Sequence, residues 1–450
     1  MNGESMNPTK PIAIAAVLII VISAAAIVVV NSSSSDDDVE IGACLRVFGN
    51  ANGDYKIDED DVKAIELCMK MTEDARAEEL AKNPLLDAYY DGVLDQKDVD
   101  QVKKIVNDEP CTVWHYNESN VENYVVDTKW PVKSALATAA ANNLWLMTMA
   151  GMDEMVHGIT YSKSSSPDPT LFPRFSEMES IGGSSTKMPI DNASKWISEY
   201  NVTAIVCDKT ESTLDKKTVE PEYEKMGVDI IRVGAALVDV DEYCAQLFLL
   251  GFLFQTEDKC TDIAKWWTSL QNEIDEKLEG AEKVKVVACN GNASANGIWV
   301  SAGTSDYKEL MIAAGGEYAL DDKVLTKYTS GAYFKKTDAW LYNYEFDKVI
   351  NVRTNDWYSG TVDDAAKYED SVGIFSETEA YQNGEAYVIT GDAPIPIRIA
   401  YAAAVMYPDI FSIDWADQKN QELLDRFTNT GLDISDLHFY ISYEMATGAN

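Results

Sequence analysis

The sequence predicts an α/β protein in which a long helix joins two lobes. A small all-α module and one apolar N-terminal helix precede the lobes. Three observations predict this arrangement. The chain opens with an uncharged run from Pro11 to Val30, and two similar acidic loops follow between residues 42 and 110. The remaining residues, 111–450, alternate short apolar runs with helical segments, which is typical of α/β layers.

The run from Pro11 to Val30 contains Ser23 as its single polar residue. As a helix it would span about 30 Å, the thickness of the hydrocarbon core of a bilayer. Lys10 precedes the run and Asp36 to Asp38 follow it, so the positive-inside rule places the bulk of the chain outside the cell. We therefore expect residues 1–31 to be a single-pass transmembrane anchor in the cell membrane. A cleaved signal peptide is the alternative, although this run exceeds the apolar core of a usual signal peptide.

The chain is strongly acidic, with 75 Asp and Glu against 37 Lys and Arg and a formal net charge of -38. Such a charge repels nucleic acid, so a nucleic-acid partner is not expected. The seven cysteines are too few for a disulfide scaffold, and their odd number leaves at least one unpaired within the chain. Cys44 and Cys111 bracket one segment and could form a disulfide; unpaired core cysteines fit equally well.

After a Ser- and Asp-rich linker, residues 32–41, the module 42–110 contains an internal duplication. NANGDYKIDEDDV from Asn50 and DAYYDGVLDQKDV from Asp87 share one pattern, and each leads into a segment with helical spacing of apolar residues. We expect these helices at Val62 to Met71 and at Val99 to Val106.

Both loops have the oxygen pattern that calcium needs. An EF-hand-like loop takes its ligands from positions 1, 3, 5, 7, 9 and 12. In the first loop these are Asn50, Asn52, Asp54, the carbonyl of Lys56, Asp58 and Asp61. In the second they are Asp87, Tyr89, Asp91, the carbonyl of Val93, Asp95 and Asp98. We expect two calcium sites, the second weaker because Tyr89 offers neither carboxylate nor amide, and we expect Ile57 and Leu94 to pack on the core of the module. Acidic turns that cap two helices are the alternative.

Each loop ends in Asp rather than Glu, and one helix follows it. In this the segment from Cys44 to Asp108 resembles a dockerin, a duplicated calcium-loop module that docks onto cohesin domains. The resemblance implies a cohesin-like partner, and positions 10 and 11 of each loop would help to choose it. These positions hold Glu59, Asp60, Gln96 and Lys97, which depart from the common Ser-Thr pair.

Short apolar runs in residues 111–450, bounded by Gly, Asp and Asn, suit buried parallel strands. The runs are Leu144 to Met149, Val156 to Tyr161, Ala204 to Cys207, Ile230 to Val233, Val284 to Cys289, Trp340 to Tyr342, Lys348 to Val352 and Ala386 to Thr390. Between the two sets lies one long helical stretch from Val240 to Leu278. We therefore expect a first lobe at 111–239, a bridging helix at 240–280 and a second lobe at 281–450.

Four stretches of this domain resemble, in order, the helix-bridged class III substrate-binding proteins of ABC importers. They are MVHGITYSKSSSPDPTLFPRFSEMESIGG from Met155, SKWISEYNVTAIVCD from Ser194, VKVVACNGNASANGIWVSAGTSDYKELMIAAGGEYAL from Val284 and GEAYVITGDAPIPIRIAYAAAVMYPDIF from Gly384. That family captures ferric siderophores, haem, cobalamin and some metal ions. The resemblance implies two Rossmann-like lobes, no enzymatic activity, a metal-chelate ligand and an importer permease as partner.

The resemblance also implies a ligand pocket between the lobes, lined by the loops that follow the strands. Those loops carry Tyr161, Ser162, Lys163, Asp208, Lys209, Asn290, Trp299, Arg353, Asn355, Trp357 and Tyr358. Aromatic faces suit a large planar or catecholate ligand, and Arg and Lys suit its acidic groups. The hypothesis concerns the cluster, because any single aromatic residue is more often a packing residue.

Other chemistries have weaker support. The chain has three histidines, too few for a zinc or manganese site with several His ligands, and it has no G-x-S-x-G, P-loop or H-E-x-x-H motif. Dockerins often accompany glycan-degrading enzymes, so a surface glycan hydrolase with paired carboxylates is the main rival interpretation. A surface adhesion or scaffold protein without a small ligand is another. We favour an extracellular receptor that captures iron-siderophore, haem or corrinoid complexes.

Overall fold

The computed structural model describes residues 39–161, 166–182, 187–210, 214–294, 297–325, 327–354, 356–360 and 362–448. The expected anchor, residues 1–31, and most of the linker lie outside these ranges. Within them, no helix combines the length and the apolar character that crossing a bilayer requires. All seven cysteines are free thiols, so the disulfide considered between Cys44 and Cys111 is not formed.

The module that carries the two acidic loops is helical and has a small core of its own. Its elements are α1 (Glu59–Cys68), α2 (Glu73–Lys82), a 3-10 turn (Pro84–Leu86) and α3 (Gln96–Val106). Leu94 is buried in that core and Ile57 packs against it, as expected. Helices α1 and α3 begin earlier than the apolar spacing indicated, because a capping box starts each of them. Helix α2 was not expected, since it buries none of its residues and so has no apolar stripe.

The first lobe contains an antiparallel hairpin and a parallel sheet. The hairpin is β1 (Cys111–Asn117) with β2 (Tyr124–Trp130), and the sheet has the order β4-β3-β5-β6. Its strands are β3 (Ala135–Thr138), β4 (Val156–Thr160), β5 (Ala204–Asp208) and β6 (Asp229–Val233), and its helices are α4 (Ala141–Met149), α5 (Pro173–Ser176), α6 (Ile190–Tyr200) and α7 (Glu220–Lys225). The run Leu144 to Met149, expected as a strand, belongs to helix α4. Most of this run is buried, and a short buried helix has the same apolar pattern as a buried strand.

The second lobe is built on a mixed sheet with the order β10-β8-β7-β11-β12-β13, in which β9 also pairs with β7. The strands are β7 (Lys285–Ser294), β8 (Gly297–Ser301), β9 (Glu317–Tyr318), β10 (Gly331–Phe334), β11 (Lys348–Arg353), β12 (Ala386–Thr390) and β13 (Tyr440–Ile441). The helices are α10 (Asp306–Ala313), α11 (Asp364–Val372), α12 (Glu379–Gln382), α13 (Ile395–Met406), α14 (Ile413–Phe427) and α15 (Tyr443–Thr447). Strands β7, β11 and β12 are parallel. The run Trp340 to Tyr342, expected as a strand, leads into a 3-10 turn instead.

The stretch expected to form one continuous helix is two helices, α8 (Val240–Phe254) and α9 (Glu257–Lys277). Helix α8 ends at Phe254, and the next residue, Gln255, takes a left-handed conformation with a φ of 57°. The chain then reverses, because Tyr243 near the start of α8 packs on Trp267 in the middle of α9, with ring centroids 4.6 Å apart. The two helices therefore form an antiparallel hairpin.

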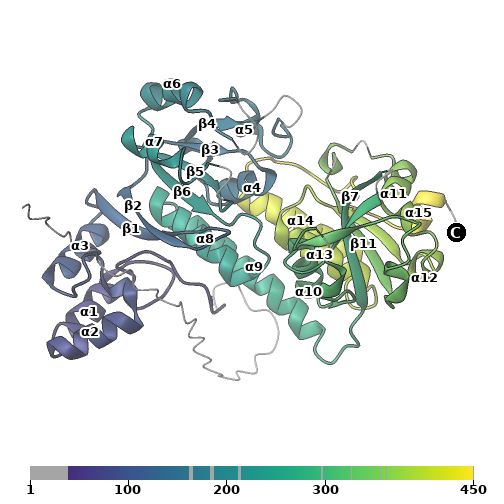
Figure 1. The fold of residues 1–450 in the computed structure, drawn as a ribbon, viewed down its shortest axis with the longest axis horizontal. Helices are drawn as coiled ribbons and strands as arrows, with labels where there is room; N and C mark the ends of the chain where they lie inside the picture. Colours follow the sequence, from purple (N-terminus) through teal and green to yellow (C-terminus); the bar gives the residue numbers. More distant parts are fainter. Residues whose placement is uncertain are drawn as a thin grey trace, which may run out of the picture. The chain divides into compact units, whose positions relative to one another are not determined.

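Of these two helices, α9 is the one that runs from the first lobe to the second (Figure 1). Near its start, Lys259 Nζ donates to the carbonyl of Thr148 in the first lobe, at 3.1 Å. Farther along, Gln271 Nε2 donates to the carbonyl of Ala313 in the second lobe, at 2.9 Å. Its 21 residues span about 31 Å. The bridging function predicted for residues 240–280 thus belongs to the second half of that range.

Candidate functional site

Charged side chains from both lobes lie within electrostatic reach of one another at the junction between them. Asp208 ends β5 and Lys209 follows it, while Asp306 begins α10 and Arg398 lies in the first turns of α13. Burial raises the pKa of the Asp306 carboxyl, Lys209 and Arg398 lower it, and Asp208 raises it. We call Asp208, Lys209, Asp306 and Arg398 the junction cluster. Because Asp306 is still exposed to solvent, protein atoms surround this carboxyl without closing it off.

Arg398 is the most buried member of the junction cluster, with 5% of its surface exposed. Its Nε donates to the carbonyl of Ala393 at 2.5 Å, and Nη2 donates to Asn142 Oδ1 in the first lobe at 3.0 Å. Burial lowers the pKa of this guanidinium. No ion pair to Arg398 is formed within the described ranges, so its direct hydrogen bonds go to neutral oxygens, while Asp306 and Asp392 act on its charge from farther away. A buried guanidinium in this state favours an anionic ligand group.

A second hydrogen bond joins the two lobes at this junction. Trp145 Nε1, on α4 of the first lobe, donates to the carbonyl of Asp392 in the second lobe at 2.7 Å. Together with the Arg398–Asn142 bond it fixes α4 against the start of α13. One hydrophobic cluster also includes buried residues from both lobes. The two lobes are therefore packed together beside the bridging helix.

Several polar atoms at or near the ends of strands in the described part of the chain are buried without a hydrogen-bond partner, among them Asn143 Oδ1, Thr160 Oγ1 and Asn290 Oδ1. Thr160 ends β4, Asn143 lies on α4 next to the end of β3, and Asn290 is on β7. Leaving such an atom unpaired costs about 1–3 kcal/mol, so each is a position where a ligand or water would be favoured. Sequence reasoning found only Asn290. Polar residues that close an apolar run were the signal for the other two.

Two aromatic residues of the expected pocket are partly accessible. Tyr161 follows β4 and its hydroxyl donates to the carbonyl of Met178 at 2.8 Å. Trp299 on β8 lies opposite Asn290 on β7, so the two side chains share a face of the sheet. Trp299 also packs edge-on against Tyr328 and Tyr333, with ring centroids 5.2 and 5.3 Å away.

Three other residues of the expected pocket belong to the core of the second lobe. Arg353 Nη1 donates to Ser371 Oγ at 2.7 Å, and Trp357, which is fully buried, donates through Nε1 to the carbonyl of Arg353 at 2.6 Å. Tyr358 donates to Asn420 Oδ1 at 2.9 Å and is also buried. Arg353, Trp357 and Tyr358 thus lie within the core of the second lobe, and the expectation that they face a ligand stays a prediction. Ser162, Lys163 and Asn355 lie outside the described residues.

The first acidic loop has the geometry of a cation-binding loop. Asn50, at position 1, is fully buried, and its Nδ2 donates to the carbonyls of Leu45 and Asp54 at 2.8 and 2.6 Å. Its Oδ1 is buried and has no partner. Asp61, at position 12, is buried and accepts hydrogen bonds from the backbone of Asn52 and Asp58. An oxygen that lacks a donor fits a cation, so the residues of this loop fit calcium.

The second loop repeats much of this geometry, including a lysine on an expected ligand, as in the first loop, where Lys56 Nζ lies 2.5 Å from Asp58 Oδ2. Both carboxyl oxygens of Asp87 accept backbone N–H groups, from Asp91 and Gly92. Lys97 Nζ lies 2.5 Å from Asp91 Oδ2, so an ammonium group occupies one expected ligand. Within the described ranges no group of three or more His, Cys, Asp or Glu could hold a metal ion. Calcium binding would therefore depend on amide and backbone oxygens as well. The first loop has one such amide oxygen, Asn50 Oδ1, without a hydrogen-bond partner.

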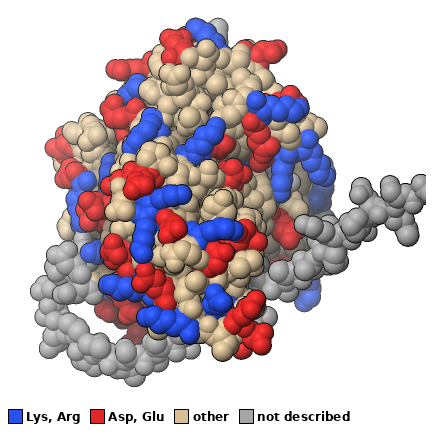
Figure 2. Space-filling view, turned by 90° about the vertical axis from the view of Figure 1, so that its left-hand side faces the viewer, with Lys and Arg blue, Asp and Glu red and all other residues tan. Residues whose placement is uncertain are grey.

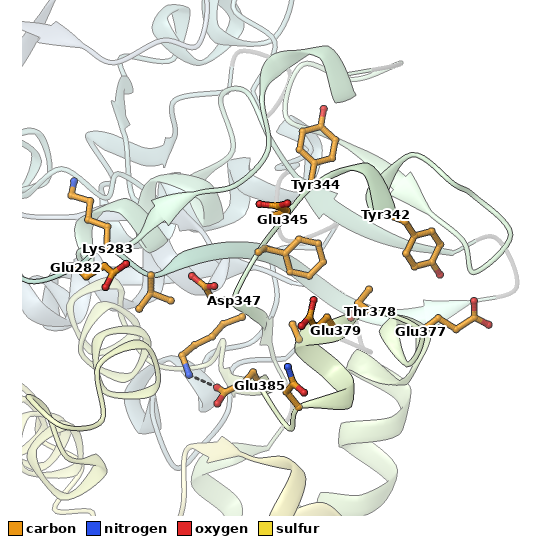
Figure 3. A pocket seen from close by; sticks show the side chains of 15 residues that line it. Glu282, Lys283, Tyr342, Tyr344, Glu345, Asp347, Glu377, Thr378, Glu379 and Glu385 are labelled. Carbon is orange, nitrogen blue, oxygen red and sulfur yellow. Dashed lines mark hydrogen bonds and ion pairs between the residues drawn. The ribbon is translucent and has the colours of Figure 1, made fainter.

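A cavity of about 1000 Å³ in the second lobe lies elsewhere. Its walls come from the residues before β7, β11 and β12, at the amino ends of these strands, whereas the expected ligand residues follow carboxyl ends. Figure 3 shows the carboxylates around it, Glu282, Glu345, Asp347, Glu377, Glu379 and Glu385, with Glu385 paired to Lys348. It contains none of the expected ligand residues, and its charge disfavours an anionic ligand. We therefore place the candidate site at the junction cluster.

Surface charge does not mark a different site on the face in Figure 2, where basic and acidic side chains are interspersed. Although the chain has a net charge of -38, neither sign of charge forms a large continuous region on this face. Recognition there would depend on local groups rather than on a broad electrostatic field.

Comparisons with known proteins agree with the two-lobed architecture. Neither a family profile nor a curated protein matches the sequence. A TroA-like periplasmic binding protein, FepB from Veillonella parvula, superposes with a TM-score of 0.55 at 13% identity, covering 73% of this chain and 99% of its own. The lobes have the fold of periplasmic binding proteins.

Two further structures support the same fold. A periplasmic solute-binding protein from Veillonella parvula superposes with a TM-score of 0.51 at 16% identity, covering 72% of this chain and 98% of its own. The molybdate-binding protein MolA of a Haemophilus influenzae ABC transporter superposes with a TM-score of 0.51 at 9% identity, covering 66% of this chain and 92% of its own. These structural neighbours are solute-binding proteins rather than enzymes.

Proposed function

We propose that this chain is the extracellular solute-binding receptor of an ABC importer and that it captures a metal chelate of the siderophore, haem or corrinoid type. The observation that carries the proposal is the junction cluster, in which charged groups of both lobes meet in the fold of a periplasmic binding protein. The resemblance implies a ligand pocket between the lobes, so both lobes would contribute groups to it.

The chemistry of the junction suits such a ligand. Lys209 and Arg398 offer cationic hydrogen-bond donors to acidic groups of a chelate, and Asn290 offers an unpaired oxygen. Trp299 and Tyr161 are partly accessible aromatic residues that suit a planar or catecholate surface. The receptor would act by binding alone, with little relative motion of the lobes, because hydrogen bonds and a shared hydrophobic cluster already join them.

The proposed partner is an importer permease in the cell membrane, with the receptor tethered beside it through residues 1–31. The proposal also includes calcium in the first loop, supported by the unpaired Asn50 Oδ1, and a weaker site in the second loop. A cohesin-like partner would contact the exposed Glu59, Asp60, Gln96 and Lys97.

A ligand panel tests the receptor function. The full chain, purified in detergent, is titrated with ferric siderophores, haem and cobalamin while its tryptophan fluorescence is followed. We expect saturable quenching by one of these classes, and Lys209→Gln should weaken that affinity about tenfold, the loss typical of one hydrogen bond to a charged group. Lys283→Gln, in the acidic cavity, is the matched control and should leave the affinity unchanged. Absence of quenching by the whole panel would refute the proposal.

A further inference from the structure

The segment from Ala43 to Phe48 belongs to the first lobe as much as to the calcium-loop module. Ala43, Leu45 and Val47 are buried in the large hydrophobic cluster of the lobes rather than in the small cluster of the module. Val47 forms an antiparallel bridge with His115 on β1. The backbone N–H of Phe48 donates to the carbonyl of Trp114 at 2.8 Å. This segment thus pairs with the edge of β1 through one isolated antiparallel bridge, and we call it the shared strand.

The first acidic loop closes on that same strand. The N–H of Leu45 donates to the carbonyl of Asp54 at 2.8 Å, and the N–H of Asn50 donates to the carbonyl of Val47 at 3.1 Å. Asn50 Nδ2 donates to the carbonyl of Leu45 at 2.8 Å. The residue at position 1 of the loop is therefore hydrogen-bonded to a strand that the first lobe holds, and any ordering of the loop acts directly on that strand.

Arg46 extends the connection into the lobe. Its Nη1 lies 2.9 Å from Glu118 Oε1 at the end of β1, and its Nη2 lies 2.6 Å from Glu242 Oε1 in the first turn of α8. Gln246 Nε2 also donates to Glu118, at 3.2 Å, and Gln246 Oε1 accepts from the N–H of Gly234 after β6. A network of polar contacts therefore runs from this strand to the carboxyl end of the parallel sheet.

Contacts elsewhere on the module support the same conclusion. Tyr55, within the first loop, packs on Phe248 of α8 with ring centroids 5.6 Å apart. Gln101 Nε2 on α3 donates to the carbonyl of Thr112 on β1 at 2.6 Å. A docking module on a flexible tether would not share a strand, a polar network and ring contacts with the domain beside it.

We propose that cation binding in the first loop stabilises the first lobe as well as the module, so that both unfold as one calcium-dependent unit. The inference rests on the calcium site proposed above. A ligand that binds only the folded state raises the stability of the whole cooperative unit that must unfold to release it. Because the shared strand is part of both the calcium-loop module and the first lobe, the first lobe belongs to the cooperative unit that calcium stabilises.

The distribution of tryptophan allows a direct test. All ten tryptophans lie at position 114 or later, so their fluorescence reports on the large domain alone. Trp114 itself contacts Tyr90 of the second loop, so Trp114→Phe serves as the background. Thermal unfolding of the full chain in detergent is followed by tryptophan fluorescence, with calcium and with chelator. At one hundred times the dissociation constant, calcium should raise the midpoint of a unit of this size by roughly 5–10 °C.

A double substitution in each loop shows which loop causes the rise in the unfolding midpoint. Asn52→Ala with Asp54→Ala removes two ligands of the first loop and should abolish the rise, whereas Asp91→Ala with Asp95→Ala in the second loop should preserve most of it. Calcium titration calorimetry on the same samples separates the two proposals. Heat of binding with an unmoved tryptophan midpoint would overturn the inference and leave the calcium site standing. Absence of binding heat would overturn both.

Discussion

At the scale of single residues, His115 links the stability of the first lobe to pH. It is fully buried, with Nε2 2.9 Å from Thr128 Oγ1, and burial lowers its pKa to about 4. The unfolded chain, with a pKa near 6.5, therefore takes up this proton first. The stability that neutral His115 contributes is complete above pH 6.5 and is lost as the pH falls toward 4, by about 3 kcal/mol in total.

We expect His115→Gln to lose this part of the pH dependence. Urea unfolding of wild type and variant at pH 7.5 and 4.5 measures it, and the difference between the two proteins cancels the titration of the many carboxylates. An equal loss of stability in both proteins on acidification would contradict the assignment.

Sequence patterns predicted the junction residues that follow strands, but not those that lie on helices. Asp208, Lys209 and Asn290 follow or end apolar runs, and such positions gather at one edge of a parallel sheet. Asp306 and Arg398 were missed because they lie on helices. Arg398 is the only charged residue in α13, a helix whose residues are all buried, and a lone cation in such a run was the available signal.

At the scale of elements, the turn between α8 and α9 depends on Gly251. A Cβ there would lie 2.9 Å from Cys260 Sγ and 3.3 Å from the Cα of Glu257. Alanine normally stabilises a helix interior relative to glycine, but this contact reverses the sign. We expect Gly251→Ala to destabilise the protein by about 1–3 kcal/mol, measured by urea unfolding. Adding Cys260→Ala should recover part of the loss, and strictly additive effects of the two substitutions would exclude the contact.

The same turn shows why sequence patterns predicted one helix where there are two. Helix ends are usually marked by Gly, Asn or Pro, whereas here Gln255 takes the left-handed conformation without a sequence signal. Six of the eight predicted strands are observed near their expected positions, as β4, β5, β6, β7, β11 and β12. The short strands β8 and β10 were missed because antiparallel strands at and beside the edge of a sheet have weaker apolar patterns than central parallel ones.

At the scale of the whole molecule, Asn142 connects the lobes by accepting a hydrogen bond from Arg398. Its neighbour Asn143 bonds to Thr138 within the first lobe instead. We expect Asn142→Ala to leave Arg398 short of a partner and to increase hydrogen exchange in α13 about tenfold or more, the effect of losing one hydrogen bond to a charged group. Asn143→Ala is the matched control, and an equal increase in both variants would show that the bond does not hold the lobes.

The order of apolar runs predicted two lobes and their sequence limits, but not that they pack together. Periodicity identifies which face of an element is buried and does not identify its partner. The single hydrophobic cluster across both lobes and the strand shared with the calcium-loop module depend on contacts between distant segments, which composition and spacing do not encode.

The shared strand also affects the order in which the chain can fold during synthesis. Arg46 and Glu118 are 72 positions apart, so the ribosome releases the strand and the first loop well before their partners on β1. Until then Leu45 and Val47 have no hairpin to cover them, and helices α1 to α3 must form around an incomplete edge. A ribosome that pauses before residue 111 would therefore leave Leu45 and Val47 without their partners on β1 and expose an incomplete apolar edge to chaperones.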